Sequence, residues 1–139
     1  MHITLEADYA IRIVYCLSHA GKRTDAKSIS EQTGVTLRFA LKILRKLVAA
    51  GIVKSYKGTQ GGYEIAKDPS EITLRAVIET VEGPYTLSRC VSPDFVCSHP
   101  GEGPCRFNAA FAEISKMVNE KLETVTFEQQ AAAPDSRKD

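Results

Sequence analysis

The chain has 139 residues, enough for one ordinary domain or a small domain with an extension, and its hydrophobic content of 43% is typical of a globular protein. No apolar stretch approaches the roughly 18 residues of a membrane span, and no basic region precedes an apolar core at the N-terminus, so we expect a cytoplasmic protein without a membrane partner. The net charge of +1 conceals an asymmetry, because residues 1–67 carry 11 Lys and Arg against 5 Asp and Glu, whereas residues 68–139 carry 7 against 12. Such a basic half indicates contact with a polyanion, although a solvated basic face has the same balance.

Three segments of the basic half have apolar residues at helical spacing. Steps of three and four residues predict helices over residues 5–20, 26–32 and 37–50. We expect Thr24 or Asp25 to cap the second helix, Gly34 to end it in a left-handed conformation, and Thr36 to cap the third helix. Two short β-prone segments follow on either side of a glycine-rich turn and predict a hairpin, with strands over 52–56 and 63–65.

The acidic half is predicted to contain two helices separated by a long loop. We expect a helix over 74–81, capped by Thr73, then a loop over 83–105 and a long helix over 106–127. Structureless loops of this length are uncommon in compact domains and usually serve a function. The apolar positions of the long helix approach a heptad repeat, which predicts burial against a two-fold mate: Phe107, Phe111, Ile114, Val118, Leu122 and Val125.

The order of elements in the basic half is typical of a winged helix-turn-helix. A short helix, a turn and a longer helix precede the hairpin, as a DNA-binding motif of this kind requires. Arg38, Phe39 and Lys42 lie off the apolar face of the longer helix and near its N-terminal end, where side chains reach base edges or phosphates. Arg45 and Lys46 lie one turn further on, and we expect them to face the DNA backbone or solvent.

The predicted hairpin has a basic, glycine-rich tip that suits the wing of this motif. Glycines let backbone amides approach a phosphate or a narrow minor groove closely, because no side chain intervenes. Small three-helix modules also mediate protein contacts, and glycines also serve tight turns, but the element order, the charge and the tip together favour DNA binding. The wing residues expected to contact DNA are Lys54, Lys57, Gly58, Gln60 and Gly61.

The four cysteines divide into one helical residue and a cluster of three. Cys16 lies in an apolar helical run, where a free thiol usually behaves as a small core hydrophobe. Cys90, Cys97 and Cys105 lie in the predicted loop, with six and seven residues between them. Structural zinc sites usually contain two cysteines only two to four residues apart, and no such pair is present here. An iron–sulfur cluster therefore fits better than zinc, and a thiol redox switch without metal is the alternative.

Several segments of the chain match motifs of one known family. The matching motifs are the wing, the opening helix and the recognition helix, which lie in 51–63, in 3–4 with 8–12, and in 35–39 with 43–47. On these motifs the chain resembles the Rrf2 family of winged-helix transcription regulators, from Met1 to about Phe127. The resemblance implies a homodimeric regulator that binds DNA.

The resemblance also implies an iron–sulfur cluster, of the 2Fe-2S or 4Fe-4S type, in the cysteine loop. Cluster-binding members carry three cysteines in this loop, at shorter spacings than those of Cys90, Cys97 and Cys105. NsrR-like members take a fourth ligand from an aspartate in the first helix of the partner subunit, and the matching position is Asp8. IscR-like members use a histidine just after the third cysteine, and residues 106–109 contain none.

These observations predict a mainly α fold with a small β-hairpin wing: a winged helix-turn-helix followed by a long C-terminal dimerisation helix. The expected domains are a DNA-binding domain over 1–67, a cysteine loop with the dimerisation helix over 68–130, and a disordered tail over 131–139. No paired catalytic carboxylates, phosphate-cradling motif or Ser/His/Asp set indicates an enzyme. We expect a repressor of a pseudo-palindromic operator in double-stranded DNA, controlled by a cluster that senses nitric oxide, iron or redox state. The alternatives are a cluster-free thiol redox switch and a winged-helix module with structural zinc.

Overall fold

Helices account for most of the structure, a computed structural model that describes residues 2–98, 101 and 103–128. The predicted tail over 131–139 lies outside the described residues. The described part contains five α-helices, two short 3-10 helices (η1 and η2) and one antiparallel hairpin. Their order is α1 (Leu5–Ala20), α2 (Ala26–Thr33), α3 (Leu37–Ala49), β1 (Val53–Tyr56), β2 (Gly62–Ile65), η1 (Pro69–Glu71), α4 (Leu74–Glu82), η2 (Arg89–Val91) and α5 (Arg106–Thr124). The predicted helices and strands agree with these bounds within one or two residues, except at the end of α5.

Side-chain caps and glycines set the helix boundaries. Thr36 and Thr73 each accept a hydrogen bond from the backbone amide three residues further on, as predicted. Of the two candidate caps of α2, Asp25 is the one used, because its Oδ1 accepts a hydrogen bond of 2.8 Å from the Ser28 amide. Gly34 ends α2 with a φ of 73°, which confirms the left-handed C-cap.

The first four α-helices pack around one apolar core. The inner faces of α1 and α3 supply its centre, including the fully enclosed Ile13 and Leu44. Burial of each such aliphatic side chain contributes about 1.5–3 kcal/mol to folding. Val77 of α4 and Phe127, beyond α5, belong to the same core. Residues on both sides of position 67 therefore share one core, and the division of the chain there stays a prediction.

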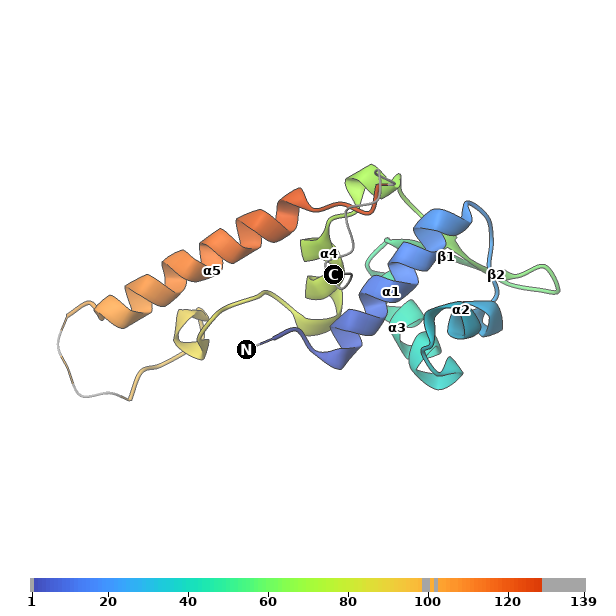
Figure 1. Cartoon of the computed structure of the whole chain (residues 1–139). Helices are drawn as coiled ribbons and strands as arrows, with labels where there is room; N and C mark the ends of the chain where they lie inside the picture. Colours follow the sequence, from blue (N-terminus) through green and yellow to red (C-terminus); the bar gives the residue numbers. More distant parts are fainter. Residues whose placement is uncertain (1, 99–100, 102, 129–139) are drawn as a thin grey trace, which may run out of the picture.

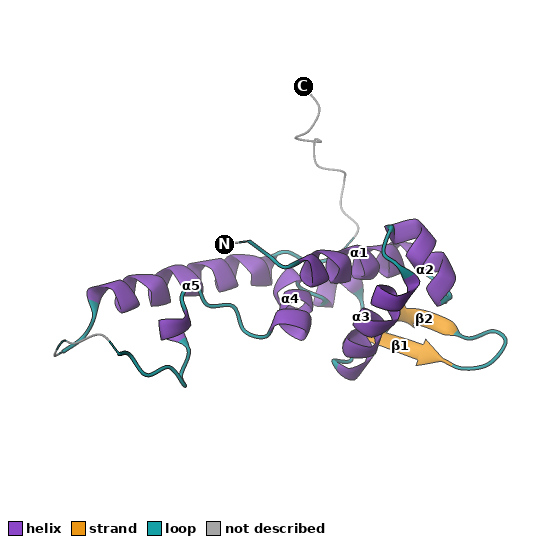
Figure 2. Cartoon of the chain, turned by 90° about the horizontal axis from the view of Figure 1, so that it is seen from below, coloured by secondary structure: helices purple, strands orange, loops and turns teal. Residues whose placement is uncertain are grey.

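The hairpin stands out from the helices at the end of the molecule opposite the N-terminal end of α5 (Figure 2). Its register pairs Val53 with Ile65 at the base and Tyr56 with Gly62 near the tip. The amide of Thr24, which precedes α2, donates a 2.9 Å hydrogen bond to the carbonyl of Tyr63 and thus extends the sheet by one bridge. The helix-turn-helix and the hairpin are therefore joined through backbone hydrogen bonds.

The long helix α5 leans away from the helical body and ends before its predicted end at residue 127 (Figure 1). After Thr124 the chain becomes extended, and Thr126 forms an antiparallel bridge with Thr73. The side chain of Phe127 then enters the core, where it is only 7% exposed. The prediction of helix to 127 is wrong because β-branched residues favour extended backbone and burial of a phenyl ring outweighs one further helical turn.

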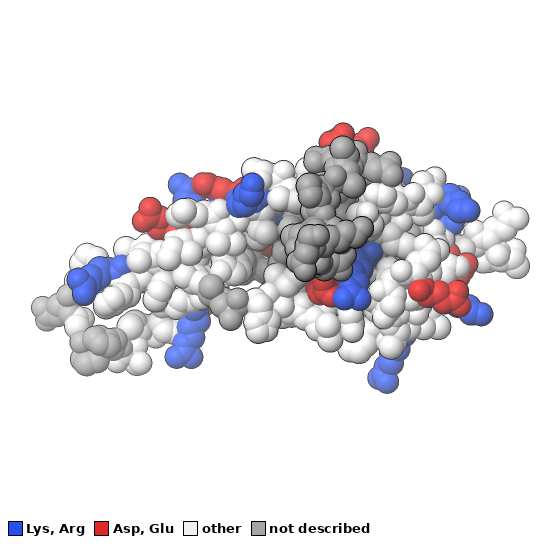
Figure 3. All heavy atoms as spheres, viewed as in Figure 1, with Lys and Arg blue, Asp and Glu red and all other residues white. Residues whose placement is uncertain are grey.

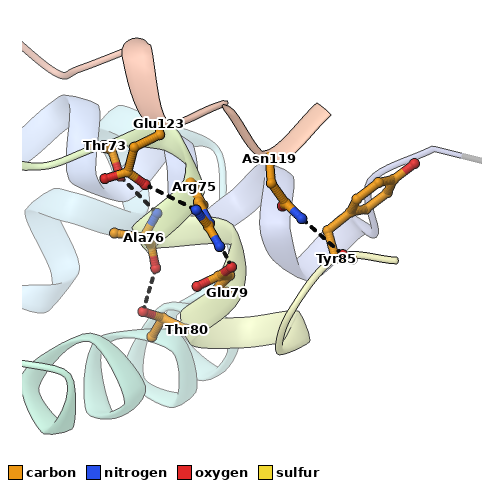
Figure 4. Close-up of polar contacts among 8 residues, drawn as sticks. All are labelled: Thr73, Arg75, Ala76, Glu79, Thr80, Tyr85, Asn119 and Glu123. Atoms are coloured by element: carbon orange, nitrogen blue, oxygen red, sulfur yellow. Dashed lines mark hydrogen bonds and ion pairs between the residues drawn. The ribbon is translucent and has the colours of Figure 1, made fainter. Parts of the chain in front are cut away.

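Polar contacts join α4 to α5 at their junction (Figure 4). Arg75 lies between two carboxylates, with Nε 2.9 Å from Glu79 Oε1 and Nη1 3.8 Å from Glu123 Oε2. Asn119 of α5 donates a 3.1 Å hydrogen bond to the backbone carbonyl of Tyr85, just beyond α4. These contacts attach the C-terminal half of α5 to the other helices.

The first part of the predicted loop follows α5 closely. The Leu87 amide donates to Ser115 Oγ at 2.8 Å, and Asn108 Nδ2 donates to the Cys90 carbonyl at 2.8 Å. Ser88 caps η2, which interrupts the segment predicted to be structureless. These hydrogen bonds are between residues far apart in the sequence, so periodicity could not reveal them.

Candidate DNA-binding surface and cysteine loop

The exposed side of α3 carries a row of basic residues. Its apolar side faces the core, so Arg38, Lys42 and Arg45 emerge on the opposite side. Among the described residues, no carboxylate forms an ion pair with any of the three. Arg38 and Lys42 were predicted to face DNA, and Arg45 extends their row by one turn. Unpaired cations in such a row attract a polyanion.

Lys46 differs from its neighbour Arg45. Its Nζ lies 2.7 Å from Glu6 Oε1, which ties α3 to the start of α1. The expectation that Lys46 faces the DNA backbone or solvent is therefore corrected, because the lysine is paired within the protein. The two partners lie 40 residues apart, and no local pattern in the sequence connects them.

Phe39 lies on the side of α3 that faces α1. Its ring meets Tyr9 edge-on, with centroids 6.0 Å apart and planes at 71°. Arg12 lies over the other ring, 5.5 Å from the Tyr9 centroid, and forms a 2.9 Å ion pair with Asp8. Tyr9 of α1 thus supports the ring of Phe39, a predicted DNA contact. The candidate metal ligand Asp8 has a cationic partner, Arg12, in its own helix.

An open groove of about 1000 Å³ runs over the exposed side of α3. A second hollow of about 230 Å³ lies between α3 and the hairpin, and Leu41 and Arg45 contribute to both. The candidate recognition helix and the wing therefore form one continuous surface. We use the name α3 surface for the part of it that lines the larger groove, which consists of Leu37, Arg38, Phe39, Leu41, Lys42 and Arg45.

The predicted wing residues lie on β1 and at the hairpin tip. The exposed ones are Lys54, Lys57, Gly58 and Gln60. Glu64 is the register partner of Lys54 on the neighbouring strand, whereas Lys57 lies at the tip. A Cβ atom at Gly61 would collide with the carbonyl oxygen of Tyr56. Gly61 is therefore required by the turn itself, and its contact with DNA stays a prediction.

Arg23 belongs to the hairpin region but was not among the predicted site residues. Its guanidinium lies 3.5 Å from the centroid of the Tyr56 ring, a close cation–π contact between the segment before α2 and the end of β1. The sequence signal that could have indicated it is the dense basic run from Lys22 to Lys57. On the face shown in Figure 3, by contrast, the basic and acidic side chains of the described residues are interspersed.

Cys90 lies in η2 beside a hydrogen-bonding serine. The hydroxyl of Ser88 is 3.2 Å from Cys90 Sγ, and its donation to the thiolate lowers the pKa of the Cys90 thiol. Asn108 and the positive charge of Arg89 act in the same direction. A cysteine with a lowered pKa is a better metal ligand and a better nucleophile at neutral pH.

The other two loop cysteines lie in open surroundings. Cys97 and Cys105 are exposed, and Cys105 precedes α5 without a side-chain hydrogen bond to the helix amides. The three thiols match the donor type that iron–sulfur clusters require. However, no three His, Cys, Asp or Glu of the described residues lie close enough to hold a metal ion. In this arrangement of the chain, Cys90, Cys97 and Cys105 do not form one ligand set.

Cys16 was expected to behave as a core hydrophobe, and the structure corrects this. The residue is only partly buried, and its thiol donates a 3.4 Å hydrogen bond to Gln32 Oε1 of α2. Burial still raises the pKa of the Cys16 thiol, the opposite of the shift at Cys90. Cys16 is thus separated from the loop cysteines in chemistry as well as in position.

The chain is similar in sequence to known transcription regulators. Residues 3–133 match the model of the Rrf2 family, described as iron-dependent transcriptional regulators. Protein aau3 of Rhizobium meliloti (strain 1021) is 30% identical over 129 residues, which cover 92% of this chain and 83% of that protein. The HTH-type transcriptional regulator CymR of Bacillus subtilis (strain 168) is 28% identical over 141 residues, covering 100% of this chain and 96% of CymR.

Solved structures show the same architecture. The structure of CymR, described as the global cysteine regulator of B. subtilis, has a TM-score of 0.73 at 27% identity and covers 91% of this chain and 93% of that one. T. potens IscR has a TM-score of 0.73 at 22% identity, covers 96% of this chain and 94% of that one, and so shows the shared fold. No helix of the described residues is long and apolar enough to cross a bilayer. The chain therefore belongs to the Rrf2 family, whose members are winged-helix transcription regulators and not enzymes.

Proposed function

We propose that this regulator acts in the cytoplasm as a homodimer that represses transcription by binding a pseudo-palindromic operator through the α3 surface and the wing. The observation that carries the proposal is the row of Arg38, Lys42 and Arg45 along the exposed side of α3, with which no described carboxylate forms an ion pair. The wing adds Lys57 at the tip of a hairpin that shares a hollow with α3. In a dimer, two such helices separated by about one helical turn of DNA read two half-sites.

Binding to duplex DNA at several salt concentrations tests this surface. Lys57→Ala should weaken binding and reduce the slope of log K against log salt by about one unit, because about one counterion is released per phosphate contact. Arg38→Ala should weaken binding and also relax the preference for particular bases. Lys116→Ala is the matched control, since it removes one positive charge from an exposed site on α5. Unchanged binding by both variants would refute the assigned DNA surface.

The dimer is proposed to form through α5. Phe107 and Ile114 expose 59% and 41% of their surface, and Met117 exposes 62%, although all three are large apolar residues. The other side of α5 faces the segment after α4, so these residues remain on an uncovered face. An apolar helix face of this kind is usually buried against a two-fold mate in soluble regulators.

The cysteine loop is proposed as the sensing element, with Cys90, Cys97 and Cys105 as ligands of an iron–sulfur cluster and Asp8 of the partner subunit as the fourth ligand. Support comes from the thiolate donor type, the lowered pKa of Cys90 and the iron dependence in the family description. A bound cluster would supply a group that reacts with nitric oxide, oxygen or reductants. The loop must change its arrangement to form the ligand set, because the three cysteines do not lie together in this structure.

The presence of the cluster can be tested in anaerobically purified protein by measuring its iron and sulfide content and its absorption spectrum. Each of the variants Cys90→Ser, Cys97→Ser and Cys105→Ser should lose the brown chromophore of the cluster. Asp8→Ala should destabilise the cluster without preventing dimerisation. Cys16→Ser should retain the chromophore and is the control thiol. Protein with one zinc per chain and no iron would instead support the winged-helix module with structural zinc.

A cluster-free thiol switch is the second candidate, and the surroundings of Cys90 favour it. Ser88 activates the thiol, and the similar protein CymR is described as a cysteine regulator. This candidate predicts that metal-free protein changes its affinity for DNA on oxidation and recovers it with a thiol reductant. Cluster control predicts that metal-free protein does not respond to either treatment.

A further inference from the structure

The α3 surface contains exposed apolar residues on both borders of its basic row. Leu37 and Leu41 lie one turn apart on the border toward the hairpin, and Phe39 lies on the border toward α1. Their exposed fractions are 45%, 40% and 44%. A solvated helix face would normally present polar residues here, so this exposure needs a physical reason.

Charge identifies the kind of partner that covers these residues. Arg38, Lys42 and Arg45 stand between the two apolar borders and have no ion-pair partner in the described part of the chain. An apolar protein segment on this surface would bury these cations without compensation, which is costly. A polyanion that also carries apolar groups removes both problems.

The major groove of duplex DNA meets this requirement. The C5 methyl of thymine is the apolar group on the base edges that face this groove, and it pairs well with aliphatic and phenyl side chains. We propose that Leu37, Leu41 and Phe39 read thymine methyl groups, while the basic row between them contacts phosphates and guanines. This inference rests on the proposed DNA binding and adds the chemical basis of its sequence preference.

The edge-on contact with Tyr9 strengthens the assignment for Phe39. A phenyl ring held by a neighbouring ring loses little conformational freedom when it meets a base, so more of the contact free energy remains available for discrimination. The leucines lie in the first half of α3, whose N-terminal residues contact base edges in helix-turn-helix proteins.

Replacement of thymine by deoxyuridine tests the proposal, since it removes the C5 methyl group and leaves the hydrogen-bonding edges unchanged. A preferred site is first selected from a random duplex pool with the full-length protein, and each thymine is then replaced in turn. Affinity should fall about fourfold at each contacted methyl, the effect of exposing one buried methyl-sized group. Thymines outside the contacted positions should show no effect.

Protein variants assign the methyls to side chains. Leu41→Ala should bind the thymine and deoxyuridine forms of its contacted position equally, and Phe39→Ala should do the same at a different position. Arg45→Ala should weaken both forms by the same factor and keep the discrimination. All three sites are exposed, so circular dichroism should show unchanged folding.

The outcomes separate this inference from the proposed function. Absence of any duplex binding would overturn DNA binding itself. Selected duplexes that bind tightly but tolerate deoxyuridine at every position would overturn methyl reading and leave DNA binding intact. Discrimination that survives in Leu41→Ala and Phe39→Ala would also overturn the assignment to these residues.

Discussion

At the scale of single residues, the partner of a charged side chain decides what that side chain can do. Arg45 and Lys46 are adjacent and both basic, yet Lys46 is joined to Glu6 whereas no described carboxylate pairs with Arg45. The lysine contributes to the packing of α3 on α1, and the arginine remains available to a ligand. Counting charges in the sequence therefore overestimates the basic surface by the cations that are already paired.

Asp25 should make stability depend on pH. The Ser28 amide and the Ser28 hydroxyl hydrogen-bond its carboxylate and lower the pKa of Asp25 below its ordinary value. A lowered folded-state pKa adds stability that is complete above the unfolded-state pKa of about 3.9 and is lost as the pH falls through the folded-state value. Asp25→Asn keeps a capping oxygen but cannot titrate, so its Tm should fall less steeply than that of the wild type below about pH 4.

A control for Asp25→Asn is a variant that removes a carboxylate which does not cap a helix. Glu31→Gln does this on the exposed part of the same helix α2. Its melting profile against pH should follow the wild type, as measured by circular dichroism. Parallel profiles for Asp25→Asn and Glu31→Gln would contradict the role of the Asp25 cap.

The two partly buried cysteines should differ in reactivity in reduced, metal-free protein. The pKa of Cys90 is lowered by Ser88, and that of Cys16 is raised by burial, so iodoacetamide should modify Cys90 first near neutral pH. Ser88→Ala should slow the modification of Cys90 several-fold and leave Cys16 unchanged, and peptide mass spectrometry measures both rates. Ser92→Ala, at the other end of η2, should leave both rates unaltered.

At the scale of elements, the helices and the hairpin could be predicted because local chemistry determines them. Asp25, Thr36 and Thr73 cap helices, and glycines end them, within a few residues of each boundary. The end of α5 could be predicted only in part, because the β-branched residues before Phe127 are visible in the sequence whereas the pocket that receives Phe127 is not. The same holds for the candidate site: the basic row of α3 follows from helical periodicity, whereas the pairing of Lys46 depends on a residue in α1.

Phe127 should stabilise the whole chain although it follows the last helix. Phe127→Ala removes a ring that is 93% enclosed by the core and should lower the free energy of unfolding by about 3–5 kcal/mol. Chemical denaturation at one fixed protein concentration measures this, because the proposed dimerisation would also contribute to stability. Glu128→Ala, at an exposed position next to it, should change the free energy of unfolding by less than about 0.5 kcal/mol.

At the scale of the whole molecule, α5 has two separate tasks on its two sides. One side accepts the segment after α4, and the other exposes the apolar residues that we propose to pack against a second copy of the chain. Truncation before Phe107 would therefore remove the proposed dimer face together with the core residue Phe127. A substitution on the exposed side alone is the cleaner test of association.

Ile114→Glu should shift the protein toward monomers. It places a carboxylate in the proposed apolar interface, and burial of an unpaired charge should raise the dimer dissociation constant at least about tenfold. Lys116→Glu changes charge on a different face of α5 and should leave association unchanged. Analytical ultracentrifugation at micromolar concentration measures both, and a monomeric wild type would contradict the dimer.

Three hydrogen bonds between α5 and the segment after α4 follow one another along the two segments. They join Cys90 to Asn108, Leu87 to Ser115 and Tyr85 to Asn119 in sequence order. Because the Tyr85 end continues directly into α4, we expect these hydrogen bonds to open from the Cys90 end. A disturbance at Cys90 should therefore release the segment stepwise toward Tyr85, and the exchange of the Leu87 amide proton would report how far the opening has progressed.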